Sequence, residues 1–172
     1  MKGCAIWVIE LGGEKLLRQP KKLRLIHIKL IGWLGYTRFT VFKEINGRWN
    51  YVNDPKDGDY IATASESLDY FSGDCDDHSI LMAAAIRSIG GTPRLIHTKG
   101  HIYPEILIGS MIDLEKINYL IKNVLFVKES YGKKIHYHID ERGQVWMNLD
   151  YTATYPGGPF MYEEILGALT LN

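Results

Sequence analysis

Residues 72–91, with the sequence SGDCDDHSILMAAAIRSIGG, carry the strongest structural signal in this chain. Asp74 has a side chain that accepts hydrogen bonds at a helix N-terminus, and Asp77 follows three residues later, as in a capping box. Apolar residues then recur at helical spacing: Ile80, Leu81, Ala84, Ala85 and Ile89. The glycine pair at 90–91 suits a helix C-terminus. The pattern predicts a helix with Cys75 on its first turn.

This position of Cys75 favours a reactive thiol. Unpaired backbone N–H groups and the positive end of a helix dipole stabilise a thiolate relative to an ordinary thiol, whose pKa is about 8.5. The carboxylates of Asp74, Asp76 and Asp77 oppose that negative charge. A cysteine nucleophile in this setting therefore needs a histidine within hydrogen-bond reach, and a third group that orients the histidine.

Composition limits the class of protein. The chain has 172 residues, of which 46% are hydrophobic, and this is enough for one domain with a packed core. Twenty basic and twenty acidic residues without a basic tract argue against nucleic acid as the main partner. Cys4 and Cys75 lie far apart, which excludes a disulfide scaffold and a zinc finger. No cofactor motif such as GxGxxG or a phosphate loop is present, so we expect no cofactor.

The N-terminal part of the sequence predicts strands. Residues 1–9 hold an apolar run too short for a signal peptide or a membrane span, so we expect no membrane segment and a cytoplasmic location. A processed piece of a longer protein fits equally well. We predict strands at Cys4–Ile9, Lys15–Arg18 and Leu23–Leu30. The whole chain is expected to form one domain, with a strand-rich extension over 1–35 and a core over 36–172. The apolar run 23–35 suits a partner surface, and the oligomeric state stays open.

Two helices are expected before Cys75. Tyr36–Val52 has apolar residues on one helical stripe, which predicts a core helix that packs on the Cys75 helix. Residues 61–72 predict a short helix that begins near Ser65 or Ser67. Gly73 then lets the backbone turn sharply before the cysteine.

Two strands are expected after the Cys75 helix, at Thr92–Thr98 and Gly100–Gly109. His101 stands at the start of the second strand, where its side chain can reach a helix N-terminus. We therefore take His101 as the partner of Cys75. Pro104 argues that this strand is an edge strand or contains a bulge.

The rest of the chain alternates in type. Residues 110–129 predict a helix capped by Ser110 and Asp113, either a packed excursion or a cover over the site. Lys134–Asp140 and Gln144–Asp150 predict a hairpin, and Phe160–Leu169 a final short helix. Asp150 ends the second hairpin strand. A carboxylate there, beside His101, would accept the imidazole N–H and fix the tautomer.

Two groups of residues have metal-ligand chemistry: Asp54, Asp57 and Asp59 in a turn, and His136, His138 and Asp140 on a strand. The first group lacks the spacing and terminal glutamate of an EF-hand loop. The second has no further ligand nearby in sequence. A solvated turn and a polar strand face explain both groups, so we expect no metal.

Four short motifs together carry a family resemblance. They are GDCDD at 73–77, GGxxR at 90–94, GHxYxE at 100–105 and WxxxDxT at 146–152. The stretch from about Tyr51 to Thr152 thus resembles the transglutaminase-like superfamily of cysteine enzymes, and YVNDP at 51–55 resembles the lead-in of bacterial members. The chain departs from the family pattern at Tyr103, where tryptophan is common, at Pro104, and in the excursion over 110–134.

The resemblance implies an α+β, papain-like fold in which the nucleophile helix packs against an antiparallel sheet. By that match Cys75 is the nucleophile, His101 the base and acid, and Asp150 the orienting carboxylate. The implied activity is that of a hydrolase or acyltransferase acting through a thioester on a peptide or glutamine-type amide. The oxyanion donors would be the Cys75 N–H and a second group, for which the candidates are Trp49, Tyr51 and Asn53.

Two other readings stay open. In one, the same fold is catalytically silent and binds a protein or peptide; Cys75, His101 and Asp150 favour an enzyme instead. In the other, the chain is a cell-wall peptidase of the second papain-like group. That group predicts a polar third residue soon after the histidine, and the strand over 146–150 argues against it.

Overall fold

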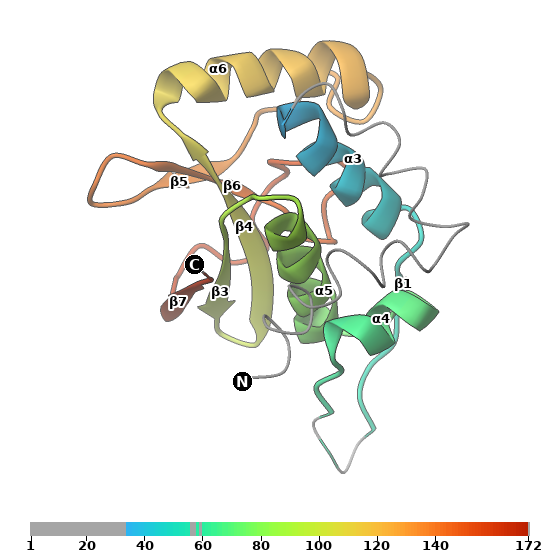
Figure 1. Cartoon of the computed structure of the whole chain (residues 1–172). Helices are drawn as coiled ribbons and strands as arrows, with labels where there is room; N and C mark the ends of the chain where they lie inside the picture. The colour runs from blue at the N-terminus through green and yellow to red at the C-terminus, as the bar shows by residue number, and fades with distance from the viewer. Residues whose placement is uncertain (1–33, 56–57, 59, 172) are drawn as a thin grey trace.

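The computed structural model describes residues 34–171 except 56, 57 and 59, so the strands expected before residue 34 lie outside it. In chain order the elements are α3 (Leu34–Asn46), β1 (Asn50–Tyr51), α4 (Ala64–Tyr70), β2 (Ser72–Gly73), α5 (Cys75–Ser88), β3 (Pro93–Thr98), β4 (His101–Gly109), α6 (Met111–Leu120), the π-helical η1 (Ile121–Leu125), β5 (Tyr137–Ile139), β6 (Val145–Asn148) and β7 (Gly167–Thr170) (Figure 1). The α+β class is confirmed. Within the described residues, no helix has the length and apolar character that a membrane crossing needs.

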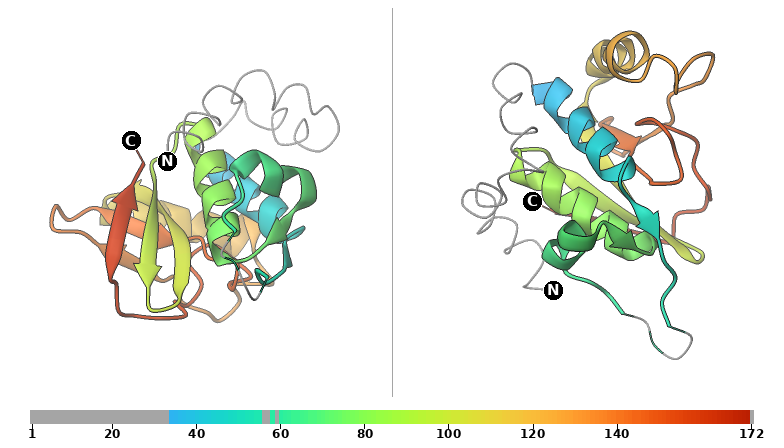
Figure 2. Two further views of the ribbon diagram at one scale, coloured as in Figure 1. Left: turned by 90° about the horizontal axis from the view of Figure 1, so that it is seen from below. Right: turned by 90° about the vertical axis from the view of Figure 1, so that its right-hand side faces the viewer.

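One antiparallel sheet organises the molecule. Its five strands follow the order β5-β6-β4-β3-β7, and every neighbouring pair is antiparallel. Helix α5 packs against β3 and β4, and α3 packs on α5 as the sequence predicted. Figure 2 shows these helices on one side of the sheet. β1 and β2 form a separate parallel pair just before α5.

Helix α5 begins where its capping residues predict. The Asp74 side chain accepts a hydrogen bond from the Asp76 N–H, and the Asp77 side chain accepts one from the Asp74 N–H, so the capping box is confirmed. Gly73 has a φ of 150°, and a Cβ at this position would collide with the Asp77 carboxylate. A glycine is therefore required immediately before the cap.

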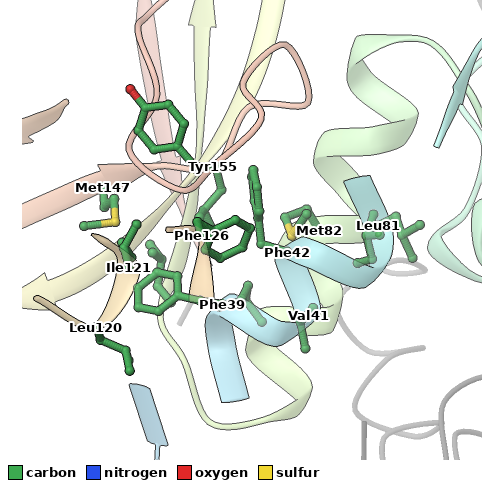
Figure 3. Packing of buried hydrophobic residues seen from close by; sticks show 14 of the residues in the cluster. Phe39, Val41, Phe42, Leu81, Met82, Leu120, Ile121, Phe126, Met147 and Tyr155 are labelled. Carbon is green, nitrogen blue, oxygen red and sulfur yellow. The ribbon is translucent and has the colours of Figure 1, made fainter. Parts of the chain in front are cut away.

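The main core lies between the helices and the sheet (Figure 3). Phe42 of α3 meets Phe126 edge to face, with 5.9 Å between the ring centroids. Other buried members are Phe39, Met82, Ile86, Ile106, Ile121, Val145 and Met147. The core thus joins α3, α5 and η1 to β4 and β6.

The helix expected over 36–52 is shorter than predicted. It ends at Asn46 and is followed by Gly47, after which residues 50–52 extend and hydrogen-bond to residues 71–73 (2.8 and 2.9 Å). The apolar periodicity continues past Asn46 and would extend the helix. Residues 50–52 are extended instead, because they pair with residues 71–73 just before α5. The same pairing carries Tyr51 toward the N-terminus of α5.

Two further expectations need correction. Residues 160–169 form no helix; they run extended into β7, which pairs with β3 and covers what would be a free sheet edge. Pro104 lies on a central strand rather than an edge strand, and the register irregularity of β4 falls further along it, between Leu107 and Gly109. The short helix expected near Ser65 is confirmed as α4, which begins at Ala64 with Thr63 as its cap.

The sheet tolerates Pro104 because of its place in the hydrogen-bond ladder. Its carbonyl accepts from the Leu149 N–H (2.9 Å), just beyond the end of β6 at Asn148. In an antiparallel pair the N–H and C=O of one residue point the same way. The side of Pro104 that lacks an N–H therefore faces Leu149, beyond the end of β6, so no hydrogen bond inside the β4–β6 ladder is lost.

The capping box of Ser110 and Asp113 is confirmed at the start of α6. This excursion is a packed part of the core, because Leu120, Ile121 and Phe126 are all buried in it. The nine residues of β4 separate α6 from His101 by about 30 Å at 3.3 Å per residue. The excursion is therefore no cover over the cysteine.

Candidate active site

Cys75 is a free, half-buried thiol on the first turn of α5. One hydroxyl links this turn to β4: Ser79 Oγ lies 2.6 Å from the Cys75 carbonyl oxygen and 3.0 Å from that of Ile102. Since Ile102 follows His101, this shared hydrogen bond fixes the distance between the turn that carries the cysteine and the strand that carries the histidine.

His101 lies between Cys75 and Asp150. It is 4% exposed, and its Nε2 is 2.7 Å from Asp150 Oδ2. The imidazole also hydrogen-bonds the Cys75 side chain, and since Nε2 is occupied, Nδ1 is the nitrogen left for the sulfur. Burial alone would lower the pKa of His101, but the hydrogen bonds to Asp150 and Cys75 outweigh it and raise the pKa to about 9. The ring is thus largely protonated at neutral pH.

Asp150 is fully buried, and both its carboxylate and its backbone N–H are hydrogen-bonded. Its second oxygen, Oδ1, accepts from the Thr152 N–H at 3.2 Å, and its own N–H donates to Asn148 Oδ1 at 2.9 Å. The Asn148 amide in turn donates to the Gly158 carbonyl at 3.0 Å. The carboxylate therefore keeps one oxygen for His101 in a fixed position.

The acidic residues around Cys75 oppose a thiolate less than their number suggests. Burial, together with the hydrogen bond and charge of Asp74, raises the pKa of Asp76 to about 8. Burial also raises the pKa of Asp77, even though backbone N–H groups of Ala62 and Asp74 stabilise its charged form. Asp76 therefore carries a proton over much of the neutral pH range.

Among the described residues, Asp74, Asp76 and Asp77 are the one group of three whose ligand atoms lie close enough to hold a metal ion. Oxygens of Asp74 and Asp77 already accept backbone N–H groups at the helix cap. On the hairpin strand, His138 Nδ1 lies 2.6 Å from Glu105 Oε1, and Asp140 Oδ2 accepts from the Trp146 indole at 3.0 Å. His138 and Asp140 therefore hydrogen-bond different residues and do not converge on a common point. Asp57 and Asp59 lie outside the described residues.

The three candidates for the second oxyanion donor occupy different places. Trp49 packs against the core with its ring edge-on to His78 (5.1 Å), and its buried indole N–H has no hydrogen-bond partner among the described residues. Asn53 is exposed. Tyr51 stacks on Tyr151 (5.3 Å), and burial and the charge of Cys75 raise its pKa. Tyr51 is therefore close enough to Cys75 for the charge of the cysteine to affect the Tyr51 pKa.

Three residues near the site escaped sequence analysis: Asn46, His78 and Tyr151. The Tyr151 ring lies 5.9 Å from that of His101, and its hydroxyl hydrogen-bonds that of Tyr51. His78 stands one helical turn after Cys75 on a face of otherwise apolar residues, and that anomaly is the signal available in the sequence. Asn46 could not be predicted from the sequence, because asparagine is common at helix ends and nothing around it indicates a further role.

No family model, curated protein or solved structure matches this chain. The functional assignment therefore depends on the chemistry and geometry of the residues described above.

Proposed function

We propose that this protein is a cysteine-dependent amide-bond enzyme of the transglutaminase-like, papain-like type, a hydrolase or acyltransferase that works through a thioester. One observation carries the proposal. The Cys75 thiol hydrogen-bonds an imidazole whose other nitrogen lies 2.7 Å from the buried carboxylate of Asp150. Nucleophilic cysteine catalysis requires this order of groups, and a buried structural cysteine does not.

The reaction follows from the roles of the three groups. The Cys75 sulfur attacks the carbonyl carbon of an amide and forms a C–S bond, and the carbonyl oxygen becomes an oxyanion. His101 then gives its proton to the departing amine as the C–N bond breaks, which leaves a thioester. Water or a second amine attacks the thioester, His101 accepts the proton of that nucleophile, and the thiolate is released. Asp150 orients the ring throughout.

We assign Tyr51 as the second oxyanion donor, beside the backbone N–H of Cys75. The Tyr51 side chain is 45% exposed, and burial together with the nearby charge of Cys75 raises its pKa, so the residue is both open to solvent and close to the cysteine. Its hydrogen bond and stacking with Tyr151 hold the hydroxyl in place without a deep pocket. A donor fixed before the reaction stabilises the oxyanion more than one that must reorganise.

The proposal is tested by trapping the thioester. Purified protein is incubated with a panel of peptides and glutamine-containing peptides, with and without a fluorescent primary amine, and intact mass spectrometry detects acyl groups. We expect an acyl adduct on Cys75 that is absent from Cys75→Ala.

Decay of the adduct in water alone would indicate a hydrolase, and amine incorporation an acyltransferase. If no substrate yields an adduct and the same peptides bind equally to the wild type and Cys75→Ala, the protein is a binding module and the proposal fails.

A further inference from the structure

We propose that the half-buried Asn46 and the fully buried His78 form a positioning pair that holds the turn carrying Asp150 and Tyr151 in its working place. This inference rests on the proposed function, because it assumes that Asp150 orients His101. Neither residue contacts the Cys75 sulfur in any observed hydrogen bond, so both act through other groups and are positioning residues rather than catalytic ones.

The pair joins three segments that are distant in sequence. His78 of α5 is fully buried, and its Nε2 lies 2.8 Å from Oδ1 of Asn46, the last residue of α3. The Asn46 amide nitrogen lies 3.2 Å from the Ala153 carbonyl oxygen and 3.5 Å from that of Asp150. The end of one helix and the second turn of another thus hold both ends of the turn over 150–153.

The direction of each hydrogen bond follows from chemistry. Backbone carbonyl oxygens only accept, so the amide nitrogen of Asn46 must face Ala153 and Asp150, and its oxygen must face His78. An amide oxygen also only accepts, so His78 Nε2 must carry a proton. The other nitrogen, Nδ1, is buried and has no hydrogen-bond partner among the described residues. His78 is therefore the neutral Nε2–H tautomer.

The surroundings of His78 keep it in that form. Burial lowers the pKa of His78 to about 3, with the nearby charge of His101 acting in the same direction and that of Asp150 against it. The ring also contacts Trp49 at 5.1 Å and Tyr151 at 5.4 Å, edge-on in both cases. The ring is a permanent neutral donor at physiological pH, unlike His101.

The pair matters because the other backbone hydrogen bonds within the turn are short-range. The Thr152 and Ala153 N–H groups both bond back to Asp150, within the turn itself. Tyr151 contacts the rings of Tyr51 and His78, and the Asp150 carboxylate bonds His101. Asn46 adds the hydrogen bonds from the backbone carbonyls of the turn to α3 and, through His78, to α5. Without it we expect the turn to shift relative to α5, which lengthens the bond between Asp150 and His101 and weakens the stabilisation of imidazolium beside thiolate.

The test compares two substitutions of one residue. His78→Phe keeps an aromatic ring between Trp49 and Tyr151 but removes the donor. His78→Gln keeps a donor, since its amide N–H reaches about as far as Nε2. The rate of Cys75 alkylation by iodoacetamide is measured from about pH 5.5 to 9.5, together with thermal unfolding.

We expect His78→Phe and Asn46→Ala to react about tenfold more slowly than the wild type near pH 6.5, the effect of roughly one lost hydrogen bond. Their rates should converge with the wild-type rate above about pH 9, where thiolate forms without help. His78→Gln should stay within about twofold of the wild type. A lower melting temperature with an unchanged pH profile would show a purely structural role and overturn the inference.

A second measurement needs no variant and covers the case in which both substitutions prevent folding. The nitrogen chemical shifts of the imidazole rings in the folded wild type report their tautomers. We expect His78 to be neutral with its proton on Nε2 down to about pH 5; a proton on Nδ1, or a protonated ring, would overturn the inference. A wild type whose Cys75 reactivity does not depend on His101 at all would instead disprove the proposed function itself, which is a separate result.

Discussion

Two histidines pair with buried carboxylates at this sheet, and one of these two histidines also contacts a thiol. His101 and Asp150 are 2.7 Å apart, and His138 and Glu105 are 2.6 Å apart, with both carboxylates fully buried. The second pair has Arg94 as a further partner, at 2.6 Å from Glu105. In the first pair the additional partner is the Cys75 side chain, and it contacts the imidazole of His101 rather than the carboxylate of Asp150.

The two carboxylates differ in their partners, and this difference is consistent with the roles proposed for them. Arg94 reaches one Glu105 oxygen with two nitrogens and lies over the Trp146 ring at 4.2 Å, while His138 stacks on Phe160 at 4.2 Å. This cluster holds β3, β4 and β5 to the C-terminal segment. Its carboxylate is shared between a guanidinium and an imidazole, which suits structure. Asp150 hydrogen-bonds the His101 imidazole through Nε2, so the other ring nitrogen remains available to the Cys75 sulfur. This arrangement suits catalysis.

The largest expected effect separates the two carboxylates. Asp150→Asn should reduce turnover of any amide that the wild type accepts by about 10⁴-fold, because the amide supports the wrong histidine tautomer. The matched variant, Glu105→Gln, should leave the rate per folded molecule unchanged. Single-turnover acylation of Cys75 provides the measurement. Equal losses in both variants would contradict the division between a catalytic and a structural pair.

The reverse pattern is expected for stability. Glu105→Gln leaves Arg94, whose side chain is 11% exposed, as a largely buried cation without its partner, and we expect a loss of about 3 kcal/mol in the free energy of unfolding. The double variant Glu105→Leu with Arg94→Met should recover much of that loss, because it removes both charges. Urea unfolding followed by circular dichroism measures all three. A double variant no better than the single one would show that packing, rather than charge, accounts for the loss.

A smaller effect tests the oxyanion assignment. Tyr51→Phe keeps the stacking on Tyr151 but removes the hydroxyl, and we expect kcat to fall by about 10²-fold to 10³-fold with little change in KM. Trp49→Phe is the control, since its indole N–H is in the core and should matter for stability alone. A large fall in kcat for Trp49→Phe, with none for Tyr51→Phe, would transfer the role to the indole.

The smallest effect concerns pH and stability. The folded-state pKa of His101 is raised to about 9 from an ordinary value of 6.5. A raised pKa means that the folded state binds the proton more tightly, so this stabilisation is complete below about pH 6.5 and is lost as the pH rises through 9. We expect a decrease of at most about 3 kcal/mol over that range. In Asp150→Asn the decrease should be much smaller. Equal slopes in the two proteins would contradict the assignment.

The parts of the fold that the sequence predicts best are those with local causes. Asp77 lies in the first turn of α5, and Asp74 and the glycines at 90–91 lie just beyond its two ends, so the bounds of α5 follow from residues local to it. The helix expected over 160–169 is wrong for the opposite reason. That segment is shaped by the free edge of β3, which no local pattern reports.

The candidate site divides in the same way. Cys75, His101 and Asp150 are identifiable because their residue types and order match a known chemical requirement. Asn46 and His78 are 32 residues apart and share no sequence motif, so their contact can be recognised only from the structure. Arg94 and Glu105 lie between these cases: they stand directly opposite each other on β3 and β4, and a correct register would have predicted their contact.

The central claim is that Cys75 is activated by His101. The most direct measurement is the pH dependence of Cys75 alkylation by iodoacetamide in the wild type and in His101→Ala, with the modified residue identified by mass spectrometry. The account predicts alkylation of Cys75 in the wild type well below pH 8, and loss of that advantage in His101→Ala. A Cys75 that reacts as an ordinary thiol in both proteins would contradict it, and would favour a binding module built on the same fold.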